Sequence, residues 1–444
     1  MNVEGKKVCV VGLGRSGVAA ANLLARRGAQ VTACDQKSAS ELDAVVSGLD
    51  KSVTLRFGTS TPEADCDWVV LSPGVNPASP VLEEARRRGV EIIGELELGY
   101  RFCSTPIIAV TGTNGKSTTA SLLGRLLRAA GRDVAVCGNI GTPLTACLDP
   151  EPGDYLVVEV SSFQLETIRE FHPRIALVLN LSADHLDRHP SLEDYAAAKE
   201  KITRNQGPED ILVLNQDDAR VRSMGAGGRA RRMGFSIREP VDTGACLLDG
   251  ALTLCRSGHC REVMPLAALP LAARLQIDNL LAALTAADAV GVSLDTMRAV
   301  LEGFTGMEHR LEWVRSVGGV DFINDSKGTN VGAVEKALSG IDRPVILIMG
   351  GRDKGGDFSR LKDLFRQRVK HMVLMGEARP KIQSVLNGSF GYEAADSMAE
   401  AVQRAWAQAR PGDVILLSPG CASFDMFRDY EERGRVFKDL VRRL

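Results

Sequence analysis

The chain has 444 residues, too many for one ordinary domain and enough for about three. It is 44% hydrophobic and 25% charged, and its formal net charge of −2 provides no basic field for nucleic acid or a membrane surface. No apolar run reaches the ~18 residues needed to cross a bilayer. A strand is predicted almost at the start, so we expect a cytoplasmic protein without a signal or transit peptide.

Residues 1–95 are predicted to form a Rossmann-like unit. The apolar run 8–11 is followed by Gly12-Leu13-Gly14-Arg15-Ser16-Gly17 and an Ala/Leu-rich helix. A second strand, 31–34, ends at Asp35, which lies 18 positions after the last glycine of this G-x-G-x-x-G pattern. The pattern predicts a diphosphate at the helix N-terminus. NAD or FAD is its usual ligand, but the pattern alone does not select the nucleotide.

Residues 96–305 are predicted to form a unit that binds a nucleoside triphosphate. The β-branched run 107–111 leads to Gly112-Thr113-Asn114-Gly115-Lys116-Ser117-Thr118, and a helix is predicted to follow. In such a loop backbone N–H groups converge on an anion, the lysine neutralises phosphate oxygens, and the serine offers its hydroxyl to Mg²⁺. The usual pattern has a glycine where this chain has Val110, so the loop is a shortened version. A helix cap without a ligand is the alternative, but the flanking strand and helix favour the phosphate loop.

Polar residues follow two further strands of this unit. Strand 155–158 leads to Glu159, and strand 175–179 leads to a segment with Asp184, His185 and Asp187. Ligands bind at the carboxyl ends of parallel strands, so Glu159 and His185 are expected to face Lys116. A carboxylate there suits Mg²⁺. His185 alone could be an ordinary loop residue, but its neighbouring aspartates favour a role in the site.

The remainder of this unit is less informative. A Gly/Arg-rich stretch, 225–232, is expected to be a solvated surface loop, and a small β-hairpin is expected around 249–250. The helix predicted at 275–290 carries Asn279. Ten cysteines are present, several of them in apolar strand-like runs. Because no second cluster joins Cys255, His259 and Cys260 to complete four zinc ligands, we expect all ten to be free thiols.

Residues 306–444 are predicted to form another α/β unit with a mostly parallel sheet. Its predicted strands are 320–323, 345–349, 371–375 and 414–417, and polar clusters follow at 324–327, 350–357 and 418–423. The stretch 306–312, with His309 and Arg310, is the best candidate for a linker. A triphosphate site, metal-capable strand ends and a cationic third unit suit the activation of a carboxylate by phosphoryl transfer. An amine held by another unit would then attack the acyl phosphate.

Several motifs resemble those of the Mur ligase family. They are T-G-T-N-G-K-S (111–117), E-V-S-S-F-Q-L-E (159–166), N-L-S-A-D-H-L-D-R-H (180–189), Y-A-A-A-K (195–199), G-M-E-H-R-L-E (306–312), N-D-S-K-G-T-N (324–330) and S-P-G-C-A-S-F-D-M-F (418–427). The resemblance implies an α/β fold with an N-terminal Rossmann-like, a central P-loop-type and a C-terminal Rossmann-like domain. It also implies an ATP-dependent ligase that adds D-glutamate to UDP-N-acetylmuramoyl-L-alanine through an acyl phosphate.

The resemblance implies roles for individual residues as well. The nucleotide-linked substrate is expected at Gly14, Arg15, Ser16, Asp35, Gln36, Ser72, Gly74, Asn139, Ser161 and Gln164. ATP is expected at Gly112, Thr113, Asn114, Gly115, Lys116, Ser117, Thr118, Asn279, Arg310 and Asp325. D-glutamate is expected at Thr329, Lys354, Ser423 and Tyr430. The implied catalytic residues are Lys116, His185, Lys199 and Lys327. Two Mg²⁺ ions are expected at Ser117, Glu159, His185 and Lys199, the last as a CO₂-derived carbamate.

Some alternatives remain open at this point. Lys199 could be a solvated helix lysine, the role of Arg352 is undecided, and Leu275-Gln276 stands where the family has His-Asn. A sister ligase that adds L-glutamate or lysine is the second hypothesis, and a nicotinamide-dependent oxidoreductase is a remote third. In each case we expect a monomer with small-molecule substrates, acting on neither nucleic acid nor membrane.

Overall fold

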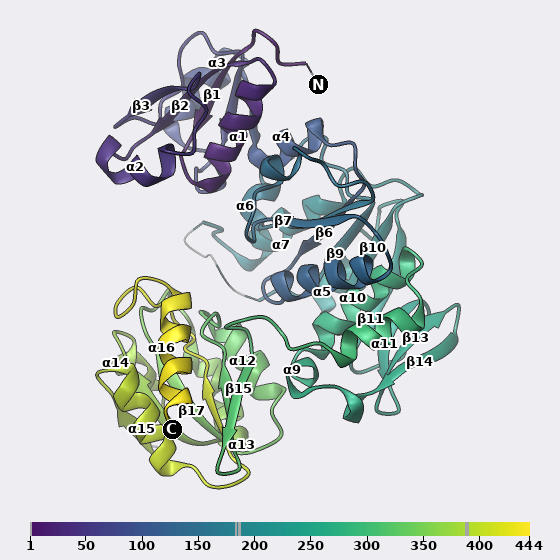
Figure 1. Ribbon diagram of the computed structural model, residues 1–444, viewed down its shortest axis with the longest axis vertical. Coiled ribbons are helices and arrows are strands. Elements are labelled where there is room, and N and C mark those ends of the chain that lie inside the picture. Colours follow the sequence, from purple (N-terminus) through teal and green to yellow (C-terminus); the bar gives the residue numbers. More distant parts are fainter. Residues whose placement is uncertain (1, 183, 185–187, 387–389) are drawn as a thin grey trace.

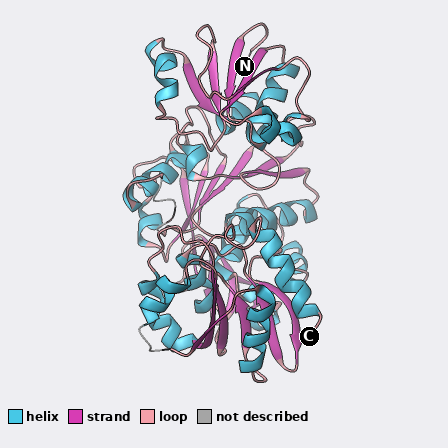
Figure 2. Cartoon of the chain, turned by 90° about the vertical axis from the view of Figure 1, so that its left-hand side faces the viewer, coloured by secondary structure: helices cyan, strands magenta, loops and turns pink. Residues whose placement is uncertain are grey.

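The computed structural model describes residues 2–182, 184, 188–386 and 390–444 as three α/β units arranged along the long axis of the molecule (Figure 1). Each unit has its own sheet with helices against it (Figure 2). The predicted fold class of three α/β domains is therefore confirmed. Among the described helices, none combines the length and apolar character needed to span a bilayer.

The N-terminal unit is a five-stranded parallel sheet in the order β3-β2-β1-β4-β5. Its elements are β1 (Lys7–Val11), α1 (Arg15–Arg26), β2 (Gln30–Asp35), α2 (Ala39–Val46), β3 (Thr54–Phe57), β4 (Trp68–Leu71), α3 (Glu83–Arg87) and β5 (Glu91–Gly94), after which α4 (Glu95–Phe102) leads into the central unit. The glycine-rich turn joins β1 to α1, as predicted. A Cβ on Gly17 would lie 1.8 Å from the carbonyl oxygen of Gly12, so this close contact between helix and turn requires glycine.

The central unit is a nine-stranded sheet in the order β14-β13-β12-β11-β10-β9-β6-β8-β7. Its strands are β6 (Ile107–Thr111), β7 (Val134–Gly138), β8 (Tyr155–Glu159), β9 (Ile175–Val178), β10 (Ile211–Asn215), β11 (Arg231–Ser236), β12 (Gly244–Leu248), β13 (Ala251–Arg256) and β14 (His259–Pro265). Its helices are α5 (Lys116–Ala129), α6 (Ser162–Leu165), α7 (Leu192–Glu200), α8 (Ala219–Ser223), α9 (Leu271–Arg274), α10 (Ile277–Ala289) and α11 (Leu294–Glu302). Strands β6 to β12 pair in parallel, and β12, β13 and β14 pair antiparallel. Helices α5 and α10 pack together in the core on one face of this sheet, and a second core covers the other face, so the central strands β6 and β9 are buried along their whole length.

One expectation for the central unit holds only in part, and another is wrong. The stretch 225–232 is only partly a loop, because Arg231 and Arg232 begin β11 and pair with β10. Cys255 and Cys260 are not free thiols but form a disulfide. The β13–β14 hairpin places them directly opposite each other, with their Cα atoms 4.0 Å apart. Such a cross-strand pairing depends on the register of the hairpin, which the spacing of the cysteines does not reveal. The other eight cysteines are free.

The C-terminal unit is a six-stranded sheet in the order β15-β16-β20-β17-β18-β19. Its elements are β15 (Glu312–Val317), β16 (Val320–Asn324), α12 (Val331–Ser339), β17 (Val345–Gly350), α13 (Lys362–Arg368), β18 (Val369–Met375), α14 (Arg379–Leu386), β19 (Tyr392–Ala394), α15 (Met398–Gln408), β20 (Val414–Leu417) and α16 (Tyr430–Arg442). All four predicted strands are present and pair in parallel. The two strands that were not predicted, β15 and β19, lie at the edges of the sheet and are partly exposed, so neither has a continuous apolar run.

Arg433 of α16 holds two strand-end loops of this unit together. The residue is 1% exposed and donates to the hydroxyl of Ser326 at 3.0 Å, to its carbonyl at 2.7 Å and to the carbonyl of Cys421 at 3.2 Å. Burial lowers the pKa of Arg433 to about 10, so its guanidinium stays charged at neutral pH. One buried side chain therefore joins the loops that follow β16 and β20.

We expect Arg433→Met to lower the free energy of unfolding by about 3 kcal/mol, because buried carbonyl groups lose their donors. Arg435→Met on the same helix is the matched control, since Arg435 is half exposed and meets Glu431 at 3.9 Å. Urea denaturation followed by circular dichroism measures both variants. Equal effects of the two substitutions would contradict the assigned role of Arg433.

Candidate functional site

The phosphate loop between β6 and α5 has the conformation that its sequence predicts. Gly112 and Gly115 have φ angles of 147° and 86°, which residues with side chains rarely adopt. Helix α5 begins at Lys116 directly after the loop, so its first N–H groups are available to an anion. Val110 lies within β6 and pairs with Glu159 of β8. The position where the usual pattern has a glycine therefore belongs to the strand.

Lys116 folds back onto this loop. Its Nζ donates to the carbonyl oxygens of Gly112 at 3.0 Å and Thr113 at 2.9 Å. Burial lowers the pKa of Lys116, and the charge of Glu159 opposes that shift. The loop carbonyls thus hold the ammonium beside the N–H groups of the helix start, and together these donors can surround phosphate oxygens.

Glu159, at the end of β8, is the centre of a buried group of hydrogen bonds. It is 2% exposed, and its carboxylate accepts from the Ser117 hydroxyl at 2.5 Å and the Asn139 amide at 2.7 Å. Arg310 of the C-terminal unit donates to the same Ser117 oxygen at 2.6 Å. A carboxylate beside a hydroxyl is an oxygen donor set that Mg²⁺ prefers. The residues present therefore fit a magnesium ion, and the Arg310 guanidinium already brings positive charge to this point.

Lys199 of α7 lies inside the central unit, so the alternative of a solvated lysine is wrong. It is 1% exposed, and its Nζ donates to the carbonyl of Gly112 at 3.0 Å and lies 4.4 Å from the centre of the Tyr195 ring. Burial and the charge of Lys116 lower the pKa of Lys199 well below its ordinary value. Both lysines donate to the same carbonyl, so each charge opposes the protonated form of the other lysine.

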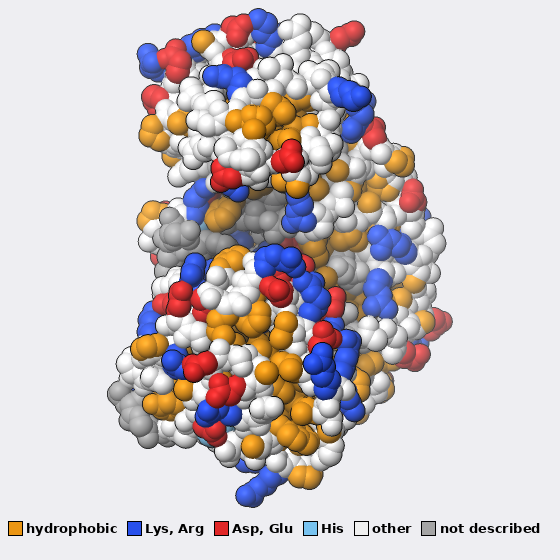
Figure 3. Space-filling model, turned by 60° about the vertical axis from the view of Figure 1, so that its left-hand side comes forward, with side chains coloured by type: hydrophobic (Ala, Val, Ile, Leu, Met, Phe, Trp, Pro, Cys, Tyr) orange, Lys and Arg blue, Asp and Glu red, His pale blue; other side chains and the backbone are white. Residues whose placement is uncertain are grey.

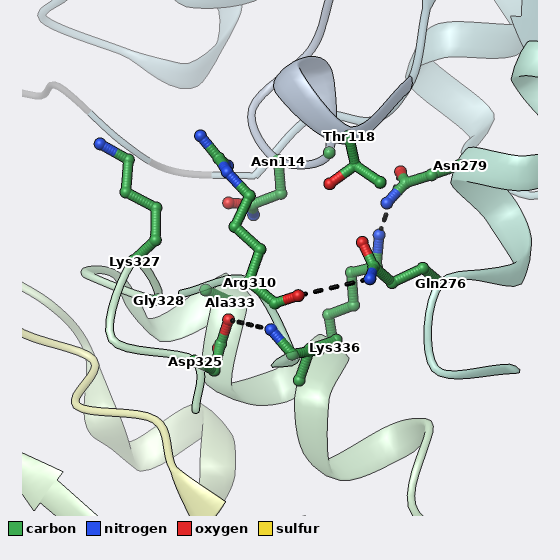
Figure 4. Close-up of a pocket in the computed structure, with 12 residues that line it drawn as sticks. Asn114, Thr118, Gln276, Asn279, Arg310, Asp325, Lys327, Gly328, Ala333 and Lys336 are labelled. Atoms are coloured by element: carbon green, nitrogen blue, oxygen red, sulfur yellow. Dashed lines mark hydrogen bonds between the residues drawn. The ribbon is translucent and has the colours of Figure 1, made fainter. Parts of the chain in front are cut away.

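A cleft between the central and C-terminal units adjoins the phosphate loop (Figure 4). It is lined by Asn114, Gly115, Thr118, Gln276, Asn279, Arg310, Leu311, Asp325, Lys327, Gly328, Ala333 and Lys336. Lys327 and Arg310 lie toward one side, and Gln276 and Asn279 lie toward the other (Figure 4). Cations bind phosphates, whereas amides can both donate to and accept from a base. The cleft therefore offers cations for phosphates on one side and amides for a base on the other, as the binding of a nucleotide requires.

The two residues that depart from the family pattern lie differently in this cleft. Leu275 is buried in the core of the C-terminal unit together with Leu311 and takes no part in lining the cleft. Gln276 does line it, and its amide donates to the carbonyl of Arg310 at 3.3 Å. Gln276 thereby ties the start of α10 to the segment that carries Arg310. No pattern in the sequence indicated this contact.

The residues predicted to bind the nucleotide-linked substrate lie in two places. Gly14, Arg15, Ser16, Asp35, Gln36, Ser72 and Gly74 belong to the N-terminal unit, and Asn139, Ser161 and Gln164 to the central unit. Arg15 donates to the carbonyl of Gly141 across the boundary at 3.3 Å. Ser72 and Gln164 line one small cavity between the units. Figure 3 shows the molecule hollowed below the N-terminal unit, with Lys and Arg side chains around the hollow.

The three of these residues that belong to the central unit have intramolecular partners within that unit. Asn139 donates to Glu159, as described above. Ser161 and Gln164 form the capping box of α6, in which the Gln164 side chain accepts from the Ser161 N–H at 3.0 Å. Their contacts with a substrate stay predictions.

The residues predicted to bind D-glutamate lie on loops and one helix start of the C-terminal unit. Thr329, Lys354 and Ser423 follow β16, β17 and β20, and Tyr430 begins α16. Lys327 Nζ lies 3.7 Å from the centre of the Tyr430 ring. Burial and the charge of Arg310 lower the pKa of Lys327 to about 8, and Lys354 contributes to this shift.

Arg352, whose role the sequence left undecided, lies outside this group. Its side chain is half exposed and forms two hydrogen bonds of 3.0 Å with Glu377. Its backbone pairs with Ala422 in an isolated bridge. The contacts of Arg352 in this structure are thus with Glu377 and Ala422.

His185 lies outside the described residues, and its predicted role stays a prediction. The adjacent Asp184 accepts from the Asn330 amide at 2.9 Å, so Asp184 contacts the residue that caps the start of α12. One further carboxylate–imidazole group was not predicted. Glu308, His309 and Glu312 have ligand atoms within 4.8 Å of one another, but Lys438 Nζ binds both carboxylates, at 2.5 and 2.7 Å. An ammonium thus already lies between the two carboxylates and offsets part of their charge.

Family models match all three units. The model described as "Mur ligase MurD-like, N-terminal domain" matches residues 6–94, "Mur ligase middle domain" matches 110–287, and "Mur ligase, glutamate ligase domain" matches 309–421. The chain belongs to the Mur ligase family. The resemblance inferred from its motifs is therefore confirmed.

Curated relatives of this Mur ligase extend over its full length. The UDP-N-acetylmuramoylalanine–D-glutamate ligase of Syntrophus aciditrophicus is 44% identical and covers 100% of the chain and 99% of the relative. The protein of that name from Thermoanaerobacter pseudethanolicus is 41% identical and covers 100% of both. Solved structures agree in fold at lower identity. A pseudomurein peptide ligase type C from Methanothermus fervidus has a TM-score of 0.63 at 19% identity, covering 99% of this chain and 100% of the other.

Asp325 in the cleft leads to a pH-dependent prediction. Its carboxylate accepts from the Leu311 N–H at 3.2 Å and the Ser418 hydroxyl at 2.9 Å, and burial raises its pKa to about 7. Between pH ~4 and ~7 the native protein then holds a proton that the unfolded chain releases, so this group destabilises the fold as pH rises.

We therefore expect the free energy of unfolding of the wild type, relative to Asp325→Asn, to decrease from pH ~4 to pH ~7. Urea denaturation of both proteins at steps across this range measures the difference. A difference that does not change with pH would show that Asp325 titrates normally.

Proposed function

We propose that the protein is an ATP-dependent ligase that adds D-glutamate to UDP-N-acetylmuramoyl-L-alanine in the synthesis of peptidoglycan precursors. The observation that carries the proposal is the contact of Arg310 with Ser117 beside Glu159. It brings a cation from the C-terminal unit to the phosphate loop, where the charge of phosphoryl transfer develops. The names of the full-length relatives support the identity of the substrates.

In the proposed reaction, the carboxylate of the L-alanine moiety attacks the γ-phosphorus of ATP, and ADP leaves. The amine of D-glutamate then attacks the acyl phosphate, phosphate leaves, and an amide bond forms with loss of a proton. Lys116 and the N-terminus of α5 bind the β- and γ-phosphates, and Arg310 meets the charge on the transferring group. Enclosure between units protects the acyl phosphate from water.

We assign one Mg²⁺ to Ser117 and Glu159, and a second to His185 and carbamylated Lys199. When bound, Mg²⁺ neutralises charge on the phosphate oxygens. Support for the carbamate comes from the burial of the Lys199 amine and from its lowered pKa, since only a neutral amine adds to CO₂ and a lowered pKa increases the neutral fraction. The product, a carbamate anion with release of one proton, would replace a repulsive lysine pair by an attractive one beside Lys116.

We assign D-glutamate to the strand ends of the C-terminal unit, at Thr329, Lys354, Ser423 and Tyr430, with Lys327 beside them. The positive charges of the two lysines suit a dicarboxylate. ATP occupies the cleft of Figure 4, with Asn279 near the base and Asp325 near the ribose. The N-terminal unit holds the uridine diphosphate at the turn of Gly14 to Ser16. We further propose domain boundaries near residues 95 and 305 and a monomeric, cytoplasmic enzyme.

The proposal is tested by supplying purified protein with ATP, Mg²⁺, UDP-N-acetylmuramoyl-L-alanine and a panel of amino acids, with phosphate release and product mass as readouts. We expect phosphate and amide product with D-glutamate. L-glutamate or lysine in its place would establish a sister ligase, and phosphate release without any amide would refute the ligase function. Lys116→Ala is the inactive control, expected to lower turnover at least ~100-fold, because it removes the phosphate-binding ammonium.

Lys199→Ala is expected to lower turnover at least ~100-fold, because the proposed metal-binding carbamate is lost. Millimolar formate or acetate should restore part of the activity by placing a carboxylate in the vacated space. Lys201→Ala is the matched control. Among the residues that the structure describes, Lys201 donates to the carbonyl of Glu166, at 3.4 Å, and to no other group. A variant with full activity, or a wild type indifferent to removal of bicarbonate, would exclude carbamylation.

A further inference from the structure

Lys336 is a charged residue of the nucleotide cleft that neither its sequence motifs nor the family resemblance singled out. It lies on α12 of the C-terminal unit and is directed across the cleft toward α10 of the central unit (Figure 4). Its Nζ is 2.8 Å from a carboxylate oxygen of Asp278 and 3.2 Å from Oδ1 of Asn279. The side chains of Lys336 and Asp278 are 25% and 24% exposed, so bulk solvent screens this pair less than a surface ion pair.

Asn279, the partner of Lys336, lies directly against the phosphate loop. It is 2% exposed, and a Cβ on Gly115 would come within 2.0 Å of its Oδ1. Among the residues that the structure describes, Lys336 is the hydrogen-bond partner of the Asn279 side chain. An ammonium has donors and no acceptor, so it fixes the orientation of an amide whose oxygen faces it. The Asn279 nitrogen then remains as the donor for a ligand.

We propose that Lys336 is a positioning residue for the nucleotide, acting through Asn279. Its ammonium fixes the Asn279 amide beside Gly115, and Asp278 supplies the charge that keeps the ammonium in place. The inference rests on the proposed function, because it takes the nucleotide of this cleft to be ATP. Helix α12 is also joined to the central unit at its start, where Asn330 donates to Asp184 at 2.9 Å. Two contacts along one helix therefore set the position of Lys336.

The test compares Lys336→Met with Glu335→Gln, a matched loss of charge one residue away. Glu335 faces Arg360 at 3.1 Å, and both side chains are 45% exposed. Calorimetry first measures the Kd of ADP with no other substrate present, and kinetics then measure KM for ATP and kcat. We expect Lys336→Met to raise both the Kd of ADP and KM for ATP about tenfold, with kcat and the other two KM values within about twofold. Glu335→Gln should match the wild type.

Two further variants separate positioning from simple packing. Lys336→Arg, which restores a donor cation, should recover most of the affinity for ADP. The double variant Lys336→Met/Asp278→Asn should bind ADP no more weakly than Lys336→Met alone, because Asp278 acts through Lys336. Wild-type affinity in Lys336→Met, or an equal loss in kcat, all three KM values and melting temperature, would overturn the proposal.

The outcome for Lys336 can be separated from the outcome for the ligase function. A wild type that binds ADP but forms no amide with any amino acid would refute the proposed function, and the ADP affinities would still decide the role of Lys336. A wild type without measurable affinity for ADP would refute both.

Discussion

The buried carboxylate of Glu159 is the constraint on which the arrangement of the site depends. A charge at the end of a central strand is costly unless hydrogen-bond donors and cations surround it. Glu159 receives donors from two directions within its own unit, Ser117 of the phosphate loop and Asn139 after β7. Through Ser117 it also reaches Arg310 of another unit. One acidic side chain therefore brings together two strand ends, a helix start and a second unit.

The basic side chains near Glu159 can carry more positive charge than its single carboxylate neutralises. Burial lowers the pKa of Lys116, Lys199 and Lys327, and the neighbouring cations lower those of Lys199 and Lys327 further. When an anion binds beside such a lysine, it favours the protonated form of the side chain and raises the pKa again. The site is therefore complementary to a polyanion that is not part of the protein. A triphosphate supplies that charge, and converting one lysine to a carbamate would supply another part of it.

The sequence predicted those features of the fold and site that depend on residues close together in the chain. The phosphate loop, the strand before it and the polar residue after β8 each follow from a local pattern, and the structure has all of them. Features that depend on how distant elements meet were not predictable. The burial of Lys199 and the contact of Gln276 with the Arg310 carbonyl are of this kind, because helices α7 and α10 carry no pattern that says which element they pack against. The strands β15 and β19 were missed for a different reason, since edge strands lack the apolar run by which the four buried strands were recognised.

The glycine-rich turn of the N-terminal unit shows why a local pattern does not determine the ligand. Both carboxylate oxygens of Asp35 accept backbone N–H groups, from Leu13 at 2.7 Å and Lys37 at 2.9 Å, so this acidic residue stabilises the turn itself. The turn provides an anion site at a helix start and no more. The surroundings of the turn restrict the ligand further, because Arg15 reaches the central unit and the cavity at Ser72 is closed by Gln164 of that unit. A ligand that places its diphosphate at this turn and its reactive end at Glu159 must extend from one unit into the next. A nucleotide-linked acceptor with a distant carboxylate is a ligand of this kind, whereas a dinucleotide held within one Rossmann-like unit would leave the phosphate loop without a substrate.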